Sequence, residues 1–527
     1  MTTNSVNGVL EGLVAQRVAS RIWAKDPSVW PSPDDGGDPA SNTLGWLQLP
    51  IGLPRLIEQF QEARSNLAKD EIADIVVLGM GGSSMTTLTL QSMLSDGESS
   101  SPKLRVLDTV HPDSVRDTSE SIDPSKTLFV ISSKSGSTVE PLSLESHFRN
   151  FTPKTGSEAG RRNFAAFTDP GTPMSERARN GEFGTWISTP LDVGGRFSAL
   201  STFGIAPAVF AGLSLEGVAD NAVRMAQECS ADSPTNPGLQ LGAFLGANAL
   251  NGKDKVTVVT SPEYAAFGLW IDQLLAESTG KHEKGLVPVT GEPILSAERY
   301  SEDRQFVFIG SKTEIELRSK LEELGHPVFT VEVDDASDIG GEFFRWEFAT
   351  AVAGSVLEIY PFDQPDVETA KQRARDLVGI ERSESTGSCV EEVVEAIGHQ
   401  SAGTYISIVA FLPESREVTD AFNRLRQAIT LANGIPTTFG YGPRYLHSTG
   451  QLFKGGPKNN LVIGFVSGKY DDLPIPGAEY TFGELLNAQA QGDFAVMREV
   501  GQSVKEIYTD TDPVDVVEKI TTALVSL

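Results

Sequence analysis

The chain has 527 residues, of which 39% are hydrophobic and 22% are charged. A typical domain of ~150 residues predicts about three folding units for this length. The formal net charge of −28 argues against a nucleic acid partner, because binding to a phosphate backbone relies on basic patches. No apolar run is long enough to cross a bilayer, so we expect no membrane partner.

The N-terminal residues MTTNSVNGVLEGLVAQ lack the basic start and the uninterrupted apolar core of a secretory signal. The two cysteines, Cys229 and Cys389, cannot build a disulfide framework, and neither has metal-ligand spacing. The six histidines form no HExxH motif. We therefore expect a cytoplasmic protein that needs no metal and no cofactor.

Alternating strand and helix signals run through the chain in order. Short β-branched or aromatic runs bounded by Gly, Ser, Pro or Asp indicate strands, and helical-length stretches lie between them. This alternation is typical of an α/β fold with parallel sheets covered by helices on both faces. The predicted strands are 74–78, 127–131, 164–167, 255–259, 306–309, 328–333, 405–411 and 461–466, and the predicted helices include 267–276, 314–324 and 418–433.

These elements predict four regions. A long stretch around 208–250 separates two series of strands, which suggests two related α/β units, and a further strand–helix–strand series follows them. The predicted boundaries are 1–59 for an N-terminal helix and arm, 60–225 and 226–371 for the two related units, and 372–527 for a C-terminal α/β region.

The first loop signal is VVLGMGGSSM, in which a strand ends in glycines and two serines follow. Glycines such as Gly81 and Gly82 let the backbone approach a ligand. The hydroxyls of Ser83 and Ser84 and the amides of a helix start can hold a phosphate. A tight strand–helix turn with a serine N-cap would explain the same residues.

A second loop of the same kind, FVISSKSGSTVEP, strengthens the phosphate interpretation. Ser133, Ser135 and Thr138 surround Lys134, which gives several hydroxyl donors and one cation at a predicted helix start. An ordinary serine-rich turn needs no lysine. Neither loop fits GxxxxGK[ST] or GxGxxG, so nucleotide chemistry is disfavoured.

Three further motifs accompany these loops: DVGGRFSALSTFG at 192–204, AESTGK at 276–281 and GSVLEIYPFDQPDVETAK at 354–371. Together they resemble the signatures of phosphoglucose isomerases, with Asp366 where that family usually has glycine. The resemblance implies two sugar isomerase (SIS) domains and a cofactor-free enzyme. Its expected reaction interconverts glucose 6-phosphate and fructose 6-phosphate through a cis-enediol.

A narrower resemblance rests on GEFFRWEFATAVAG, YGPRYLHSTGQLFKGGP and TFGELLNAQAQGDF. These segments are similar to the isomerase portion of bacterial transaldolase–phosphoglucose isomerase fusion proteins. No transaldolase half is present, so a stand-alone relative and an isolated isomerase half both remain open. The resemblance also implies a homodimer, and pairing with a transaldolase is a further expectation.

The resemblance assigns three catalytic roles. Glu277 matches the base that moves a proton between C1 and C2, Arg196 matches the cation that stabilises the enediolate, and Lys371 matches a group that assists ring opening. Each residue alone has a simpler interpretation. Glu277 would be an exposed glutamate at a helix end, Arg196 would be paired with Asp192, and Lys371 would be a solvated lysine.

The resemblance also assigns the binding residues. We expect the phosphate to be held by Ser133, Lys134, Ser135 and Thr138, and the sugar to be contacted by Gly82, Ser83 and Gln364.

A ring-opening histidine is harder to place. The interval 281–354 contains only His282 and His326, and neither stands in the family's usual setting. His447, far downstream in a glycine-bounded stretch, is our candidate, because a neutral imidazole can accept and return a hydroxyl proton. The alternative is that His447 caps or braces a surface loop.

Two other functions remain open at this point. The same chemistry could act on another hexose phosphate or a sulfonated sugar, because hydroxyl donors do not distinguish one tetrahedral oxyanion from another. A non-catalytic sugar-phosphate sensor would also keep the loops. It ranks lower, since it would not need a base, an arginine and a lysine together.

Overall fold

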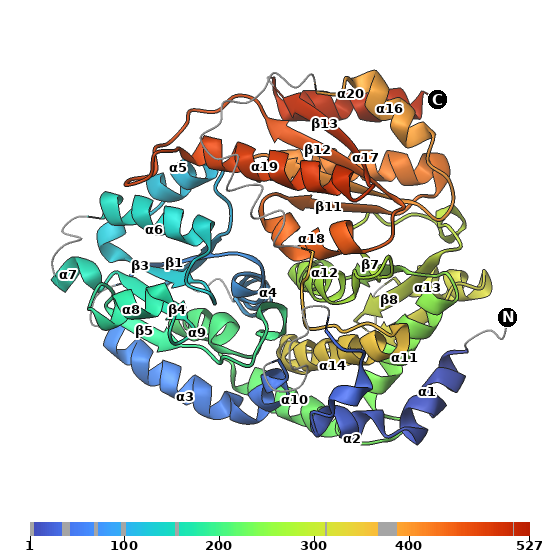
Figure 1. Ribbon diagram of the computed structural model, residues 1–527, viewed down its shortest axis with the longest axis horizontal. Helices are drawn as coiled ribbons and strands as arrows, with labels where there is room; N and C mark the ends of the chain where they lie inside the picture. Colours follow the sequence, from blue (N-terminus) through green and yellow to red (C-terminus); the bar gives the residue numbers. More distant parts are fainter. Residues whose placement is uncertain are drawn as a thin grey trace.

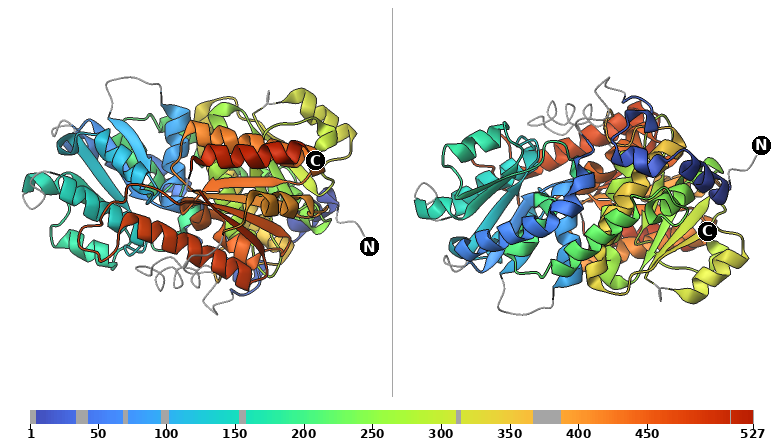
Figure 2. Two further views of the ribbon diagram at one scale, coloured as in Figure 1. Left: turned by 90° about the horizontal axis from the view of Figure 1, so that it is seen from above. Right: turned by 90° about the horizontal axis from the view of Figure 1, so that it is seen from below.

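The computed structural model describes residues 5–33, 43–67, 72–95, 102–152, 158–310, 314–366, 387–509 and 511–526. Within them the chain forms three parallel sheets flanked by helices, which confirms the α/β class (Figures 1 and 2). The three sheets fall inside the predicted units 60–225, 226–371 and 372–527. The unit boundaries themselves stay predictions.

The strands of all three sheets follow one pattern of order. The first sheet is β2-β1-β3-β4-β5, the second β7-β6-β8-β9 and the third β11-β10-β12-β13. In each sheet the first strand therefore lies between the second and the third. The bounds are β1 Asp74–Gly79, β2 Lys103–Leu107, β3 Thr127–Ser132, β4 Phe164–Thr168, β5 Thr185–Ser188, β6 Lys255–Thr260, β7 Val287–Thr290, β8 Arg304–Ile309, β9 Val328–Val331, β10 Tyr405–Phe411, β11 Thr437–Tyr441, β12 Asn460–Ser467 and β13 Ser503–Thr509.

This order creates a switch point between the first and third strands of each sheet. Successive connections leave in opposite directions there, and ligands of open α/β sheets bind beyond the carboxyl ends of the two strands. In the first sheet these strands are β1 and β3, and the two loops singled out in the sequence follow them directly.

Every strand predicted from the sequence is present, but five others were missed: β2, β5, β7, β11 and β13. All five are edge strands of their sheets. The interior strands β1, β3, β10 and β12 are buried along their whole length and are mostly apolar. By contrast, β13 contains the consecutive charged residues Lys505 and Glu506, β7 contains proline and β11 contains glycine, and each of these weakens a strand signal.

Helices cover the sheets and form the core between the first two units. There α14 is buried along most of its length and packs against α10 and α11. Among the described residues no helix is long and apolar enough to cross a bilayer. The helix bounds are α1 Val6–Ala15, α2 Val18–Trp23, α3 Leu49–Leu67, α4 Met85–Leu94, α5 Pro112–Glu120, α6 Val139–Phe151, α7 Glu158–Arg161, α8 Pro173–Arg179, α9 Thr202–Phe210, α10 Glu216–Glu228, α11 Pro237–Leu250, α12 Ala265–Thr279, α13 Ile315–Glu323, α14 Ile339–Leu357, α16 Val390–Gly398, α17 Arg416–Asn433, α18 Arg444–Gly455, α19 Phe482–Glu499 and α20 Pro513–Val525.

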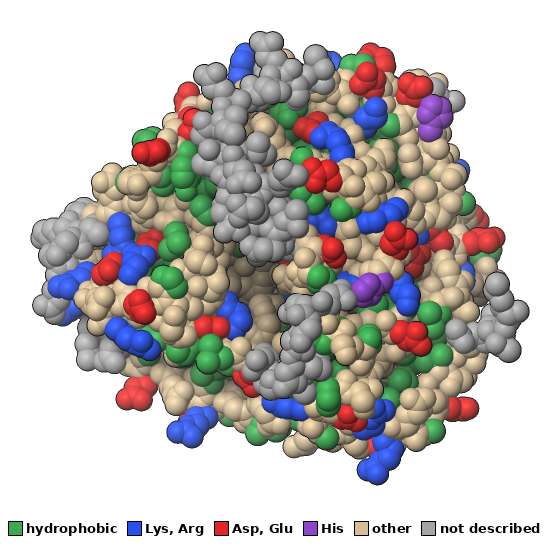
Figure 3. Space-filling view, viewed as in Figure 1, with side chains coloured by type: hydrophobic (Ala, Val, Ile, Leu, Met, Phe, Trp, Pro, Cys, Tyr) green, Lys and Arg blue, Asp and Glu red, His purple; other side chains and the backbone are tan. Residues whose placement is uncertain are grey.

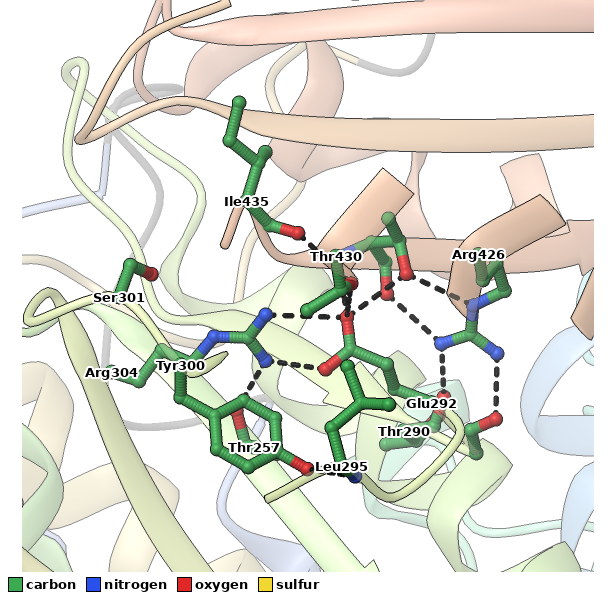
Figure 4. A network of polar contacts seen from close by, with 12 residues as sticks. Thr257, Thr290, Glu292, Leu295, Tyr300, Ser301, Arg304, Arg426, Thr430 and Ile435 are labelled. Atoms are coloured by element: carbon green, nitrogen blue, oxygen red, sulfur yellow. Dashed lines mark hydrogen bonds and ion pairs between the residues drawn. The ribbon is translucent and has the colours of Figure 1, made fainter. Parts of the chain in front are cut away.

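A buried polar network docks the third unit onto the second (Figure 4). The Glu292 carboxylate pairs with Arg304 and accepts the backbone N–H of Thr437 at 2.8 Å. Arg426 on α17 donates to the carbonyl oxygens of Gly291 at 2.7 Å and Thr437 at 2.9 Å. Burial alone would raise the pKa of Glu292, but the two arginines outweigh it and hold that pKa below its usual value. The network joins α17 and β11 of the third unit to the segment that follows β7, and removing one member would leave a buried charge unpaired.

Candidate functional site

A cleft of about 990 Å³ lies beyond the carboxyl ends of β1 and β3. Its walls come from the two loops of the first unit, from α12 of the second and from α18 and α19 of the third. The helices α12 and α18 meet near the centre of Figure 1, and Figure 3 shows the surface hollowed near that centre.

The cleft brings together all the predicted site residues that the structure describes. Lys371 lies outside the described residues. The others line one cavity, although they are spread over more than three hundred positions of the chain: Gly82, Ser83, Ser133, Lys134, Ser135, Thr138, Arg196, Glu277, Gln364 and His447. Their individual roles stay predictions.

The glycines of the first loop allow a close approach between two segments. Gly81 has a positive φ of 59°, a conformation that favours glycine. A Cβ atom on Gly82 would collide with the carbonyl oxygen of Gly195. The loop can therefore lie against the GGR motif, and Ser132 at the end of β3 donates to the carbonyl oxygen of Ser83 at 3.2 Å.

The second loop presents hydroxyls at the start of α6. Thr138 is the N-cap residue, but its side chain makes no capping bond and lies 2.9 Å from the Ser133 hydroxyl and 3.5 Å from the Ser135 hydroxyl. The amides of the first helical turn lack partners within the helix and carry partial positive charge. Hydroxyls and amides together suit a tetrahedral oxyanion.

Lys134 is held differently from the hydroxyls. Its ammonium pairs with the buried carboxylate of Asp169 and also donates to the carbonyl oxygens of Pro190 at 3.2 Å and Leu191 at 3.4 Å. The lysine thus neutralises an acidic side chain that itself lines the cleft. Without Lys134, the charge of Asp169 would repel an anion.

Glu277 lies in the last turn of α12 and is 4% exposed, so the interpretation as a surface residue is wrong. One carboxylate oxygen accepts from the amide of Gln273 at 3.0 Å, and the other accepts from the amide of Gln364 at 3.1 Å. These two hydrogen bonds fix the orientation of the carboxylate.

Arg196 is also buried, at 2% exposed. Its guanidinium donates to the Ser278 hydroxyl at 2.7 Å and to the carbonyl oxygen of Pro361 at 2.6 Å. The predicted alternative, a pairing with Asp192, is wrong, because the Asp192 carboxylate lies instead beside Lys25 at 3.8 Å. Burial lowers the pKa of Arg196, but an arginine stays charged.

A further ion pair joins the AESTGK segment, residues 276–281, to the FDQ segment, residues 362–364. Lys281 is 1% exposed, and its ammonium lies 2.7 Å from the carboxylate of Asp363. It also donates to the carbonyl oxygen of Tyr360. The pair holds the segment that carries Gln364 against the end of α12.

His447 lies on helix α18, so the surface-loop interpretation is wrong. Its Nε2 atom lies 2.6 Å from a carboxylate oxygen of Glu140 on α6, which also accepts from Gln489 on α19. Burial alone would raise the pKa of Glu140, but His447 and these hydrogen bonds lower it below its usual value. Neither His282 nor His326 lines the cleft.

Sequence reasoning did not assign several polar residues that line this cleft, among them Glu140, Gln273 and Gln489. Gln273 stands four positions before Glu277 on the same helix, and this spacing was a usable signal. Glu140 follows the hydroxyl loop by two residues, and no local pattern marks it as a buried partner of a histidine 307 positions away. Gln489 had only its place in a motif used for the resemblance.

The chain is similar to known isomerases. Residues 53–291 match the family model of phosphoglucose isomerase. A probable glucose-6-phosphate isomerase from Haloquadratum walsbyi is 27% identical over 371 residues, covering 63% of this chain and 85% of the relative. A glucose-6-phosphate isomerase from Symbiobacterium thermophilum is 27% identical over 409 residues, covering 67% and 91%.

Solved structures show the same fold. A hypothetical protein from Thermus thermophilus superposes with a TM-score of 0.60 at 24% identity, over 70% of this chain and 95% of that one. A glucose-6-phosphate isomerase from Chlamydia trachomatis has a TM-score of 0.55 at 18% identity, over 75% and 89%.

The hydroxyl loop generates the first prediction. Thr138→Ala should raise KM for a sugar phosphate about tenfold and leave kcat nearly unchanged, because a phosphate contact is the same in the ground and transition states. Lys134→Ala should also raise KM, since it exposes the charge of Asp169. Steady-state kinetics measure both.

The double variant Lys134→Ala/Asp169→Asn separates two roles of the lysine. If Lys134 acts by neutralising Asp169, the double variant recovers most of the lost affinity. A KM as high as that of Lys134→Ala alone would contradict this and assign Lys134 a direct phosphate contact.

Proposed function

We propose that this chain is an aldose–ketose isomerase that interconverts glucose 6-phosphate and fructose 6-phosphate through a cis-enediol. The observation that carries the proposal is a buried carboxylate, Glu277, in the same cleft as a hydroxyl loop at a helix start and a buried guanidinium. The matching family model and the named relatives support the same reaction.

In this mechanism the phosphate is bound by the hydroxyls of Ser133, Ser135 and Thr138 and by the first amides of α6. The sugar then extends past Gly82 and Ser83 toward α12. Binding at one end fixes the distance of the reacting carbons from the base, and this positioning supplies part of the rate enhancement.

Glu277 removes the proton from C2 of the open-chain aldose, or from C1 of the ketose, and returns it to the neighbouring carbon. The two amide donors keep its carboxylate oriented between these carbons. Arg196 stabilises the negative charge that develops on the enediolate oxygens, because its guanidinium is fixed in place before the reaction begins.

Ring opening is assigned to His447, with Glu140 holding its imidazole, and to Lys371. The imidazole accepts the C1 hydroxyl proton of the cyclic sugar while the lysine protonates the ring oxygen. We further propose a cytoplasmic homodimer. Pairing with a transaldolase, expected from the narrower resemblance, also stays a prediction.

The test of this function is turnover by the purified chain. With fructose 6-phosphate as substrate, glucose 6-phosphate should form and be measurable with a coupled dehydrogenase. Glu277→Gln should lower kcat by at least about a thousandfold while substrate still binds, because the amide is nearly isosteric but cannot act as a base.

The control for this variant is Glu263→Gln, the same change on an exposed glutamate just before α12, which should leave kcat unchanged. Near-wild-type turnover by Glu277→Gln would remove Glu277 from the mechanism. Turnover only of another hexose phosphate or a sulfonated sugar would contradict the proposed substrate.

A further prediction concerns His447. His447→Ala should slow turnover of cyclic hexose phosphates and spare proton exchange on a shorter sugar phosphate that cannot cyclise. Exchange into the short substrate can be followed by NMR in deuterated water. Equal loss on both substrates would indicate structural damage, and no loss on either would contradict the assigned role.

A further inference from the structure

We infer that Gln451, on α18 of the third unit, is a positioning residue for the base Glu277 and for its amide partner Gln364. The inference rests on the proposed isomerase function. It makes the C-terminal α/β region part of the catalytic apparatus and not only a neighbour of it.

Gln451 is fully buried and bonds two distant segments at once. Its side-chain amide donates to the carbonyl oxygen of Gly280 at 2.9 Å and to the carboxylate of Asp366 at 2.6 Å. Its carbonyl oxygen accepts the backbone N–H of Asp366 at 3.1 Å. A buried amide with these three bonds is held in one orientation.

Both segments bear directly on the base. Gly280 caps the C-terminus of α12 three residues after Glu277, and a Cβ atom there would collide with the backbone of Leu452 on α18. Asp366 lies two residues after Gln364, which donates to the Glu277 carboxylate at 3.1 Å. One side chain therefore fixes the helix end that carries the base and the loop that orients it.

Asp366 stands where phosphoglucose isomerases usually have glycine, and its side chain adds a hydrogen bond with Gln451. A glycine at 366 could still donate its backbone N–H to Gln451, but it would lack the carboxylate that accepts the second bond. The aspartate thus turns a single contact into a two-point clasp between the FDQ segment and α18.

The same face of α18 also borders the cleft. His447, Gln451 and Lys454 stand at positions i, i+4 and i+7, and both His447 and Lys454 line the cavity. Lys454 is 3% exposed and pairs with Asp493 on α19 at 2.7 Å. The helix is therefore anchored on both sides of Gln451.

The test compares Gln451→Met with a matched control, Gln502→Met. Gln502 is equally a buried glutamine of the third unit, and its amide donates to the carbonyl oxygens of Phe453 at 2.9 Å and Pro457 at 3.1 Å, but it does not contact Gly280 or Asp366. Both variants should lower the thermal midpoint. Only Gln451→Met should lower kcat, by about 10- to 100-fold with KM within about twofold, because a small misplacement of the base slows the chemical step while the phosphate loop is untouched.

Two further variants separate positioning from damage. Asp366→Asn keeps an acceptor oxygen and should retain most of kcat. Asp366→Gly removes one of the three bonds of Gln451 and keeps the bond from the backbone N–H, so it should lower kcat less than Gln451→Met does.

The outcomes are distinct. If wild-type protein does not isomerise fructose 6-phosphate, the proposed function fails and this inference fails with it. If wild type turns over and Gln451→Met keeps its kcat, or loses no more kcat than Gln502→Met, the inference alone is overturned.

Discussion

The arrangement of this molecule depends on keeping one buried carboxylate correctly aimed. A carboxylate removed from water needs hydrogen-bond donors to replace its hydration. Glu277 accepts from two amides, that of Gln273 on its own helix and that of Gln364 in the FDQ segment. Arg196 is buried in the same cleft, where its guanidinium donates to a hydroxyl and a backbone carbonyl and interacts electrostatically with Glu277.

Meeting this constraint requires three units to converge. The first unit supplies the hydroxyl loops at its switch point, the second supplies α12 with Glu277, and the third supplies α18 and α19. The Lys281–Asp363 ion pair holds the FDQ segment on α12. The Glu292–Arg304–Arg426 network docks the third unit on the second, and the cleft's third wall depends on that docking.

The sequence allowed the local features to be predicted but few of the long-range ones. Interior strands such as β10 were found because burial on both faces leaves a continuous apolar run, whereas the missed strands lie at sheet edges. The two loops and Glu277 were found from their motifs. The Glu140–His447 contact and the Asp366–Gln451 clasp could not be found, because each joins segments far apart in sequence whose proximity depends on how the units dock.

Solvent exchange during isomerisation tests directly whether Glu277 carries the proton. When the wild-type chain converts fructose 6-phosphate in deuterated water, a carboxylate that carries the proton between C1 and C2 can exchange it while the enediol exists. We expect deuterium at C2 of the glucose 6-phosphate formed, detectable by NMR or mass spectrometry, and its loss together with turnover in Glu277→Gln. Turnover and deuterium at C2 that persist in Glu277→Gln would contradict the assignment of Glu277 as the base.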